Sequence, residues 1–292
     1  MASSSLHPPL LEWYAVSARS LPWRQANPDP WGVLVSEIML QQTPVNRVLP
    51  AWETWMTRWP SPHDLAAEPT GEAVRMWGRL GYPRRALRLH AAAVACVEKF
   101  GGRVPTTYED LRSLPGVGDY TAAAVLAFAY GRRSVVLDTN VRRALARLLE
   151  GKALAGPSVT KAERRRAEEV LPDDEATAAL WSVALMELGA LVCTATSPSC
   201  TACPVATMCT WLASGRPAHD GPIRVAQPFA GTDRQVRGLI MAIVRDAENP
   251  VAKASLDAVW PDPMQRERAL DSLVVDGLVD PLPDGTYGLP TS

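Results

Sequence analysis

The sequence predicts a mainly α-helical protein that ends in a small domain of both helices and strands. Over residues 8–212, apolar residues recur at spacings of three and four, and the apolar segments end at Gly or Pro. No stretch of this region alternates apolar and polar residues convincingly enough to predict a sheet. In residues 233–292, amphipathic helical stretches precede an Asp-Gly turn that predicts a small hairpin.

The composition is that of a soluble globular protein. Its 292 residues are 47% hydrophobic, which suffices for one large domain or two modest ones. Because 30 Lys and Arg balance 31 Asp and Glu, any contact with nucleic acid must come from a local patch. We find no secretory pattern and no apolar stretch that would span a bilayer, so we expect a cytoplasmic protein without a membrane partner.

The helices of residues 8–212 carry recognisable start and stop signals. Thr43 before Pro44 predicts an N-cap and a first helical turn, and Thr107 begins a capping box. The stretch "DYTAAAVLAFAYG" predicts a helix of small residues that ends at Gly131. Asp138 follows an apolar run and precedes "TNVRRALARLL", which predicts a helix N-cap.

The C-terminal third divides into a linker and a further domain. Residues 213–232 are rich in Pro, Gly and Ala without apolar periodicity, which predicts a linker. Three short helices and a hairpin in residues 233–292 predict a winged-helix-like α+β domain. Such a domain can dock on DNA, bind another protein or cap the first domain, and the residues favour none of these over the others.

Four of the five cysteines fall within seventeen residues. This crowding in a cytosolic chain favours a metal or cluster site over disulfides. Four thiolates can hold a 4Fe-4S cluster or a tetrahedral zinc ion, and the spacing leaves both open. The fifth, Cys96, lies in an apolar helix and is expected in the core. The candidate ligands are Cys193, Cys200, Cys203 and Cys209.

A tight turn with Gly116, Val117 and Gly118 connects two predicted helices. Its glycines leave backbone N–H groups uncovered at the start of the second helix, where the helix dipole favours an anion such as a DNA phosphate. This contact would not read the base sequence. A plain turn between helices is the alternative.

Three carboxylates stand in surroundings that need an explanation. Glu37 and Glu187 each interrupt an apolar helix, where an unpaired acid must find a partner or become protonated. A structural hydrogen bond to a neighbouring helix end is the alternative for each. Asp138 would be kept ionised by the N–H groups that it caps, and an ionised acid at a pocket edge can stabilise a cationic sugar-like transition state.

Taken in order, these motifs resemble one family, the adenine DNA glycosylases of the MutY type, which belong to the helix-hairpin-helix, iron-sulfur glycosylases. The resemblance covers residues 10–212. Each motif is similar to a motif of the family, and the motifs occur in the same order as in the family. They are "LPWR" at 21–24, "SEIMLQQT" at 36–43, "LGY" at 80–82, "LPGVGDYTA" at 114–122, "LDTNVRR" at 137–143 and the cysteine run.

The resemblance implies a monomeric enzyme that flips adenine out of duplex DNA, where it faces 8-oxoguanine or guanine, and hydrolyses its glycosidic bond. Glu37 would be the general acid, with its pKa raised by the apolar helix, and Asp138 would stabilise the oxocarbenium-like sugar. Tyr120 and Asn140 would orient this pair. Relatives that also cut the strand carry Lys in place of Tyr120, so we expect a monofunctional glycosylase. The resemblance also favours the 4Fe-4S cluster over zinc.

Three further sets of residues follow from the resemblance. The adenine pocket would be lined by Arg19, Trp23, Arg24 and Glu187. The groups that wedge into the base stack and contact the orphaned 8-oxoguanine would be Gln42, Thr43, Leu80 and Tyr82. The DNA backbone would lie on Gly116, Val117 and Gly118.

The sequence also departs from the family. Pro83 follows Tyr82 where relatives usually have a second Tyr, and the loop after Cys193 carries no charge. The last sixty residues are too few for the Nudix-like domain with which many members recognise 8-oxoguanine. Two alternatives are a thymine or uracil mismatch glycosylase and a non-catalytic iron-sulfur DNA-binding regulator. Glu37 argues against the first, because pyrimidines leave without a purine-directed acid. Glu37 and Asp138 together argue against the second, because a protein that only binds DNA needs neither.

Overall fold

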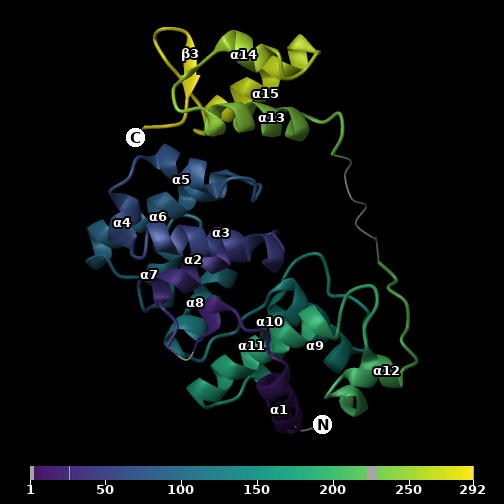
Figure 1. The fold of residues 1–292 in the computed structure, drawn as a ribbon. Helices are drawn as coiled ribbons and strands as arrows, with labels where there is room; N and C mark the ends of the chain where they lie inside the picture. The colour runs from purple at the N-terminus through teal and green to yellow at the C-terminus, as the bar shows by residue number, and fades with distance from the viewer. Residues whose placement is uncertain (1–2, 26, 222–228, 292) are drawn as a thin grey trace. The chain divides into compact units, whose positions relative to one another are not determined.

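The computed structural model describes residues 3–25, 27–221 and 229–291. The chain forms two compact units, each built from several stretches of sequence. The first unit comprises residues 1–37, 106–112 and 117–222, and the second comprises 38–105, 113–116 and 223–292. Most described residues are helical (Figure 1), which confirms the mainly α prediction. The described part of residues 8–212 holds no strand, as expected.

The first unit is a helical bundle around α11 (Glu175–Leu191), which packs against α1, α8 and α9. Asp174 caps α11 by accepting a hydrogen bond from the N–H of Thr177 at 2.8 Å. The buried face of α11 forms a core with α9 and α1, in which Trp181 and Leu185 are among the large residues. The other elements of this unit, two of which run on into the second, are η1 (Ser3–Leu6), α1 (His7–Ser17), η2 (Pro22–Arg24), α2 (Pro30–Leu40), α7 (Tyr108–Ser113), α8 (Asp119–Tyr130), α9 (Thr139–Glu150), α10 (Lys161–Glu169), η3 (Cys200–Ala202), η4 (Ala206–Met208) and α12 (Thr210–Ala213).

Small side chains allow α8 to lie deep in the first unit. Its residues 121–127 are all buried. The helix ends at Gly131, whose φ of 63° is left-handed, so the predicted glycine stop is confirmed. The predicted cap at Thr107 is also confirmed, because its hydroxyl accepts the N–H of Asp110 at 3.2 Å.

The second unit packs four helices of the central sequence around a cluster of tryptophans. They are α3 (Val45–Arg58), α4 (Pro62–Ala66), α5 (Thr70–Trp77) and α6 (Arg84–Phe100). The rings of Trp55 and Trp59 meet edge to face with centroids 4.7 Å apart, and Trp77 meets Trp55 in the same way at 5.7 Å. Cys96 is fully buried on α6, as predicted.

The predicted N-cap at Thr43 is wrong. The N-cap residue of α3 is Pro44, and no side chain caps this helix. The Thr43 hydroxyl instead donates to the Leu80 carbonyl at 3.3 Å and accepts from Nη2 of Arg85 at 2.9 Å. A buried guanidinium from α6 thus takes the oxygen that local sequence assigned to a helix end.

The second unit ends in residues 233–292, called here the C-terminal segment. Its helices are α13 (Asp233–Asp246), α14 (Lys253–Asp257) and α15 (Pro263–Val275). An antiparallel sheet of order β1-β3-β2 joins β1 (Val251–Ala252), β2 (Asp280–Pro281) and β3 (Thr286–Gly288). The predicted hairpin is therefore confirmed at β2 and β3, while β1 is a strand that periodicity did not reveal because it is two residues long.

Two other expectations concern the chain between and beyond these units. Of the predicted linker 213–232, residues 222–228 lie outside the described residues. Among the residues that the structure does describe, no helix is long and apolar enough to cross a membrane.

Candidate functional site

Glu37 lies on the buried helix α2 of the first unit. Asp29 begins this helix by accepting hydrogen bonds from the N–H groups of Trp31 and Gly32, at 3.3 and 2.9 Å. The Glu37 side chain is only 4% exposed. Its Oε2 accepts a hydrogen bond from the Tyr120 hydroxyl of α8 at 2.8 Å. The structure therefore brings together two residues that the sequence analysis selected from motifs 83 residues apart.

The surroundings of Glu37 favour its protonated form. Burial raises the pKa of Glu37 to about 7, against the lowering effects of the Tyr120 hydrogen bond and of the Arg24 charge. The negative charge of Asp138 adds to the rise. The expected upward shift of this pKa is confirmed, and a carboxyl that titrates near neutral pH can both give and take a proton.

Asp138 is the N-cap of α9, as predicted. Its Oδ1 accepts the N–H of Val141 at 2.6 Å, and its Oδ2 accepts the side-chain amide of Asn140 at 2.8 Å. Burial raises the pKa of Asp138, while these hydrogen bonds lower it. Both carboxylate oxygens are thus oriented by donors from the first turn of the helix.

Asn140 is itself held by a network that the sequence analysis missed. Nη2 of Arg143 donates to Oδ1 of Asn140 at 2.8 Å and to the Gly189 carbonyl at 2.6 Å. Nε of the same guanidinium donates to the Cys193 carbonyl at 2.8 Å. A hydrogen-bonded path therefore runs from Asp138 through Asn140 and Arg143 to the first cysteine.

Gly189 is the point where α11 comes nearest to Asn140. A Cβ at position 189 would lie 2.7 Å from the Asn140 Cβ and 2.8 Å from its carbonyl oxygen. Only glycine permits this approach without a shift of one helix. A glycine inside a helical pattern is the only signal by which the sequence could have revealed this contact.

Glu187 is fully buried and paired with two arginines. Its Oε1 accepts Nε of Arg19, and its Oε2 accepts Nη1 of Arg24, each at 2.7 Å. Burial alone would raise the pKa of Glu187, but the two arginines outweigh it and lower the pKa to about 2. Glu187 therefore forms an ion-pair triad, and its Oε1 also accepts the backbone N–H of Arg19, just beyond the end of α1, at 3.1 Å, which is the helix-end hydrogen bond of the structural alternative.

Two aromatic residues accompany this triad. Trp23 is buried in η2, beside Arg24 in the sequence. Tyr14 of α1, which the sequence analysis did not select, has its pKa raised by burial, while Arg24 lowers it through charge and a hydrogen bond. All four predicted adenine-pocket residues therefore belong to the first unit, together with Glu37, Tyr120, Asp138 and Asn140.

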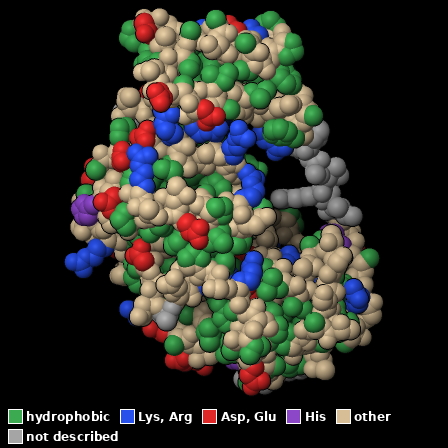
Figure 2. All heavy atoms as spheres, in the orientation of Figure 1, with side chains coloured by type: hydrophobic (Ala, Val, Ile, Leu, Met, Phe, Trp, Pro, Cys, Tyr) green, Lys and Arg blue, Asp and Glu red, His purple; other side chains and the backbone are tan. Residues whose placement is uncertain are grey.

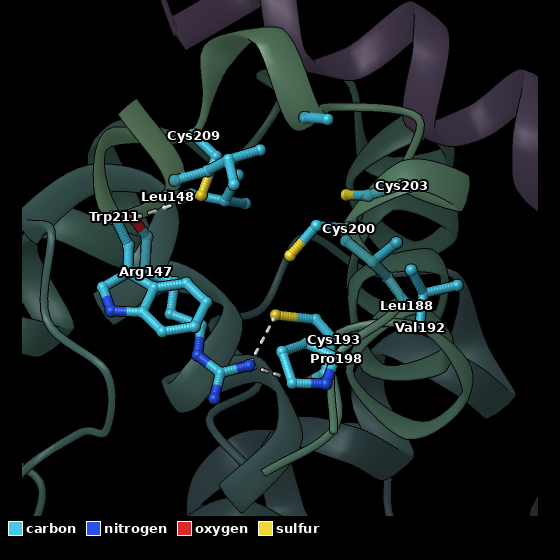
Figure 3. A pocket seen from close by; sticks show the side chains of 12 residues that line it. Arg147, Leu148, Leu188, Val192, Cys193, Pro198, Cys200, Cys203, Cys209 and Trp211 are labelled. Carbon is cyan, nitrogen blue, oxygen red and sulfur yellow. Dashed lines mark hydrogen bonds between the residues drawn. The ribbon is translucent and has the colours of Figure 1, made fainter. Parts of the chain in front are cut away.

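The four cysteines line one cavity of the first unit, which also has the apolar residues Leu148, Leu188 and Val192 on its wall (Figure 3). Nη1 of Arg147 lies 3.3 Å from the Cys193 sulfur, and its guanidinium stacks on Trp211 at 4.4 Å from the ring centroid. Burial raises the pKa of Cys203 to about 11, and the other three thiols add to the rise. A cavity lined by four free thiols and a cation fits a sulfur-ligated, electron-rich group.

No three His, Cys, Asp or Glu side chains of the described residues converge on one metal ion. The fit of a sulfur-ligated group to this site therefore rests on the four sulfur donors and on the cavity that they share.

The predicted phosphate turn has the expected backbone. Gly116 has a φ of 82°, which is left-handed, and Gly118 is the N-cap of α8 without a side-chain cap. No atom lies within 4 Å of where a Gly118 Cβ would be. Arg112 holds the turn by donating to the Val117 carbonyl at 2.7 Å.

The four remaining predicted residues, Gln42, Thr43, Leu80 and Tyr82, belong to the second unit. Gln42 and Tyr82 are exposed and have left-handed φ values of 59° and 49°, which are unfavourable for residues other than glycine. Thr43 and Leu80 are buried and joined by the hydrogen bond described above.

Arg85, another residue that the sequence analysis missed, joins these two short stretches. Its Nη1 donates to the Met39 carbonyl at 2.8 Å, and its Nη2 donates to Thr43 Oγ1 and the Gly81 carbonyl, each at 2.9 Å. Burial lowers its pKa to about 10. The guanidinium also lies 5.5 Å from the centroid of the Tyr82 ring.

Comparison with known proteins gives a consistent result. Residues 35–171 match the family model described as HhH-GPD superfamily base excision DNA repair protein. The adenine DNA glycosylase of Mycobacterium tuberculosis is 50% identical over 282 residues, which are 96% of this chain and 92% of that protein. A thymine-DNA glycosylase of Aeropyrum pernix is 35% identical over 205 residues, 69% of this chain and 92% of that protein. The solved structure of a thermostable thymine-DNA glycosylase aligns with a TM-score of 0.64 and 26% identity, covering 73% of this chain and 97% of that one.

Proposed function

This chain belongs to the adenine DNA glycosylases of base excision repair, and we propose that it removes adenine that faces 8-oxoguanine or guanine in duplex DNA. The reaction is hydrolysis of the N-glycosidic bond after the base has been flipped out. One observation carries the proposal: a buried carboxyl with a pKa of about 7, hydrogen-bonded by Tyr120 and electrostatically coupled to Asp138.

Glu37 gives its proton to a ring nitrogen of the flipped adenine. The bond between the sugar and the base then breaks, its electron pair leaves with the protonated adenine, and the sugar becomes oxocarbenium-like. Glu37, now a carboxylate, takes a proton from the water that adds to the sugar, which restores the acid. Burial supports this role because it keeps the carboxyl protonated near neutral pH.

Asp138 stabilises the cationic sugar with its negative charge. Its orientation by Asn140 and by the N–H of Val141 supports this role, since a fixed carboxylate needs no reorganisation when the cation forms. Tyr120 orients Glu37 by its hydrogen bond. Tyr120 has no amine that could form an imine with the sugar, so the enzyme is monofunctional.

The flipped adenine lies against Arg19, Trp23, Arg24 and Glu187. The triad of Glu187 with the two arginines supports this, because it presents fixed donors and acceptors that recognise the edge of a base. The charge of Arg24 also lowers the pKa of Glu37, so a residue of the adenine pocket influences the general acid.

Duplex DNA is the partner. Its backbone lies on the N–H groups of Gly116, Val117 and Gly118, which is supported by the open start of α8. Gln42, Thr43, Leu80 and Tyr82 enter the base stack and contact the orphaned 8-oxoguanine. This role is supported by Gln42 and Tyr82, which are exposed and have a left-handed backbone. Arg85 holds the backbone next to Tyr82 by donating to the Gly81 carbonyl.

Cys193, Cys200, Cys203 and Cys209 would hold a 4Fe-4S cluster. The group would cross-link the loop of residues 193–209 and would supply none of the hydrolytic chemistry. Arg147 supports a cluster of net negative charge by its contact with Cys193 Sγ. In this chain Arg143 connects the same loop to Asn140.

The domain organisation completes the proposal. The glycosylase domain is residues 8–212, followed by a linker of residues 213–232 and a winged-helix-like domain of residues 233–292. Three helices and an antiparallel sheet in the C-terminal segment support the last assignment. The protein acts as a monomer in the cytoplasm, associated with the nucleoid.

The test is single-turnover base release from duplexes that hold A opposite 8-oxoguanine, A opposite G, or T opposite G. Each is analysed with and without alkali, for the wild type, Glu37→Gln and the matched control Glu53→Gln, whose side chain is exposed. We expect adenine release from the first two duplexes, strand breakage only with alkali, and a silent Glu37→Gln variant. Release of thymine instead would favour the function of the Aeropyrum pernix relative, and a fully active Glu37→Gln would remove the general acid.

A further inference from the structure

The C-terminal segment is attached to the rest of the second unit by an exchange of arginines. Nη1 of Arg75, on α5, donates to the carbonyls of Arg245 and Ala247 at the end of α13, the latter at 2.8 Å. Nη1 of Arg245 donates back to the Gly78 carbonyl, just beyond the end of α5, at 2.9 Å. Each helix end therefore has its free carbonyls satisfied by an arginine from the other.

A second contact lies at the other end of α5. The N–H of Gly71 donates to the Pro290 carbonyl at 2.7 Å, and a Cβ at position 71 would lie only 2.5 Å from that oxygen. A third contact reaches α6, where Arg84 forms an ion pair with Asp276 at 3.2 Å. The C-terminal segment thus binds both helices that flank residues 78–83, called here the recognition turn.

The recognition turn is held through its carbonyl oxygens. Arg47 donates to the Arg79 carbonyl, Thr43 to that of Leu80 and Trp77 to that of Gly81. These three donors come from α3, its entry and α5. The Gly78 carbonyl, by contrast, is held by Arg245 of the C-terminal segment. Tyr82 follows four residues later with its left-handed backbone, so its position depends on both groups of donors.

The charge of the C-terminal segment argues against a direct contact with DNA. It holds ten Asp and Glu against six Lys and Arg. Several of its cations are already paired, such as Arg268 with Asp233 at 2.7 Å and Lys253 with Asp257 at 2.6 Å. A DNA-binding surface needs cations that are free to meet phosphates.

The turn region is rich in exposed cations. On the face of the second unit seen in Figure 2, Lys and Arg side chains gather in a band next to the C-terminal segment. The exposed arginines of this region are Arg47, Arg79, Arg84 and Arg88.

We propose that the C-terminal segment acts on the recognition turn and not on DNA: through Arg245 and Arg75 it holds the turn so that Tyr82 is presented to the base opposite the adenine. Arg75 and Arg245 are positioning residues for discrimination between 8-oxoguanine and guanine. This inference rests on the proposed role of Tyr82. In this proposal the C-terminal segment favours 8-oxoguanine indirectly, through the turn, whereas a larger C-terminal domain would contact the base itself.

The test uses the full chain and compares Arg245→Ala, Arg75→Ala and Gly71→Ala with Arg268→Ala, whose side chain pairs within the C-terminal segment. The first measurement is hydrogen exchange of residues 78–83. We expect faster exchange in the first three variants and no change in Arg268→Ala. Gly71→Ala is informative because alanine otherwise favours a helix, so its effect reports the clash with Pro290.

The second measurement is single-turnover excision from A opposite 8-oxoguanine and from A opposite G. We expect the ratio of the two rates to fall by about tenfold to a hundredfold in Arg245→Ala, with the rate for A opposite G unchanged. Arg245→Lys, which keeps a cationic N–H donor group, should restore part of the ratio. General destabilisation would lower both rates together.

Unchanged exchange in Arg245→Ala would overturn the inference, as would an equal loss of both rates or an equal effect of Arg268→Ala. The exchange measurement needs no substrate. If the wild type released no adenine, the proposed function would fail while the attachment of the turn would still be decided by exchange.

Discussion

The Tyr120 hydroxyl donates a hydrogen bond to Oε2 of Glu37 at 2.8 Å, joining a buried acid to the start of the helix that follows the glycine turn. Burial raises the pKa of both groups, that of Glu37 to about 7, so the phenol stays protonated and can only donate to the carboxylate. The protonation of Glu37 therefore depends on the position of the helix that follows the glycine turn.

Tyr120→Phe should raise the pKa of Glu37 above its value of about 7, because the hydrogen bond that lowers it is lost. Excision needs protonated Glu37, so the rate falls as pH rises through this pKa. We expect the alkaline limb of the single-turnover rate profile to move to higher pH in Tyr120→Phe. Tyr287→Phe, in the C-terminal segment, is the control. A limb that stays in place or moves to lower pH would contradict the assignment of this limb to Glu37.

Glu37→Gln should stabilise the protein at alkaline pH. The folded-state pKa of about 7 lies above the ordinary value of 4.5, so the folded state binds the proton more tightly and loses stability as pH rises between these values. Removing the acid should therefore raise the free energy of unfolding by about 2 to 3 kcal/mol more at pH 8 than at pH 5. Urea denaturation at both pH values measures this, with Glu53→Gln as control. An equal effect at both pH values would mean that the pKa of Glu37 is not raised.

Glu187→Ala should destabilise the protein by about 3 kcal/mol at pH 7, because it leaves two arginines near the core without their partner. The pKa of Glu187 is lowered to about 2, so its contribution is present above the ordinary value of 4.5 and is lost as pH falls towards 2. Denaturation of wild type and variant should therefore converge at acidic pH. The partly exposed Arg19 sets the magnitude at the low end for a buried pair. A constant difference at all pH values would indicate lost packing alone.

Gly189→Ala should slow adenine excision while DNA affinity is kept. Its Cβ would meet Asn140 at 2.7 Å and push the residue that orients Asp138. A displacement of this kind costs about a hundredfold in rate. Gly238→Ala is the matched control, because no atom lies within 4 Å of its added Cβ and alanine stabilises a helix by about 0.5 to 1 kcal/mol relative to glycine. Equal rates for both variants would mean that α9 shifts without disturbing Asp138.

Structural features that depend only on residues close together in the chain could be predicted from the sequence. The N-cap at Asp138, the glycine end of α8, the hairpin of β2 and β3 and the mainly helical fold depend on residues within a few positions of each other. The adenine glycosylase family was also predicted, because its motifs and their order can be recognised in the sequence without knowing which residues lie close in space. The comparisons confirm this prediction. Thr43 shows where local signals end, because a guanidinium 42 residues away takes the oxygen expected at a helix end.

By itself, the sequence determined that the fold is mainly helical, where several helices begin or end, which family they compose, and that Glu37 and Glu187 needed an explanation. The tertiary structure alone decided which explanation applies: Glu37 is buried against a phenol and has its pKa raised to about 7, whereas Glu187 faces two arginines and has its pKa lowered to about 2. It also decided that Arg143 joins Asn140 to the cysteine loop and that Arg245 reaches Gly78. The reason is physical, because a pKa or a hydrogen bond depends on which groups meet in space, and that is set by packing between residues far apart in the chain.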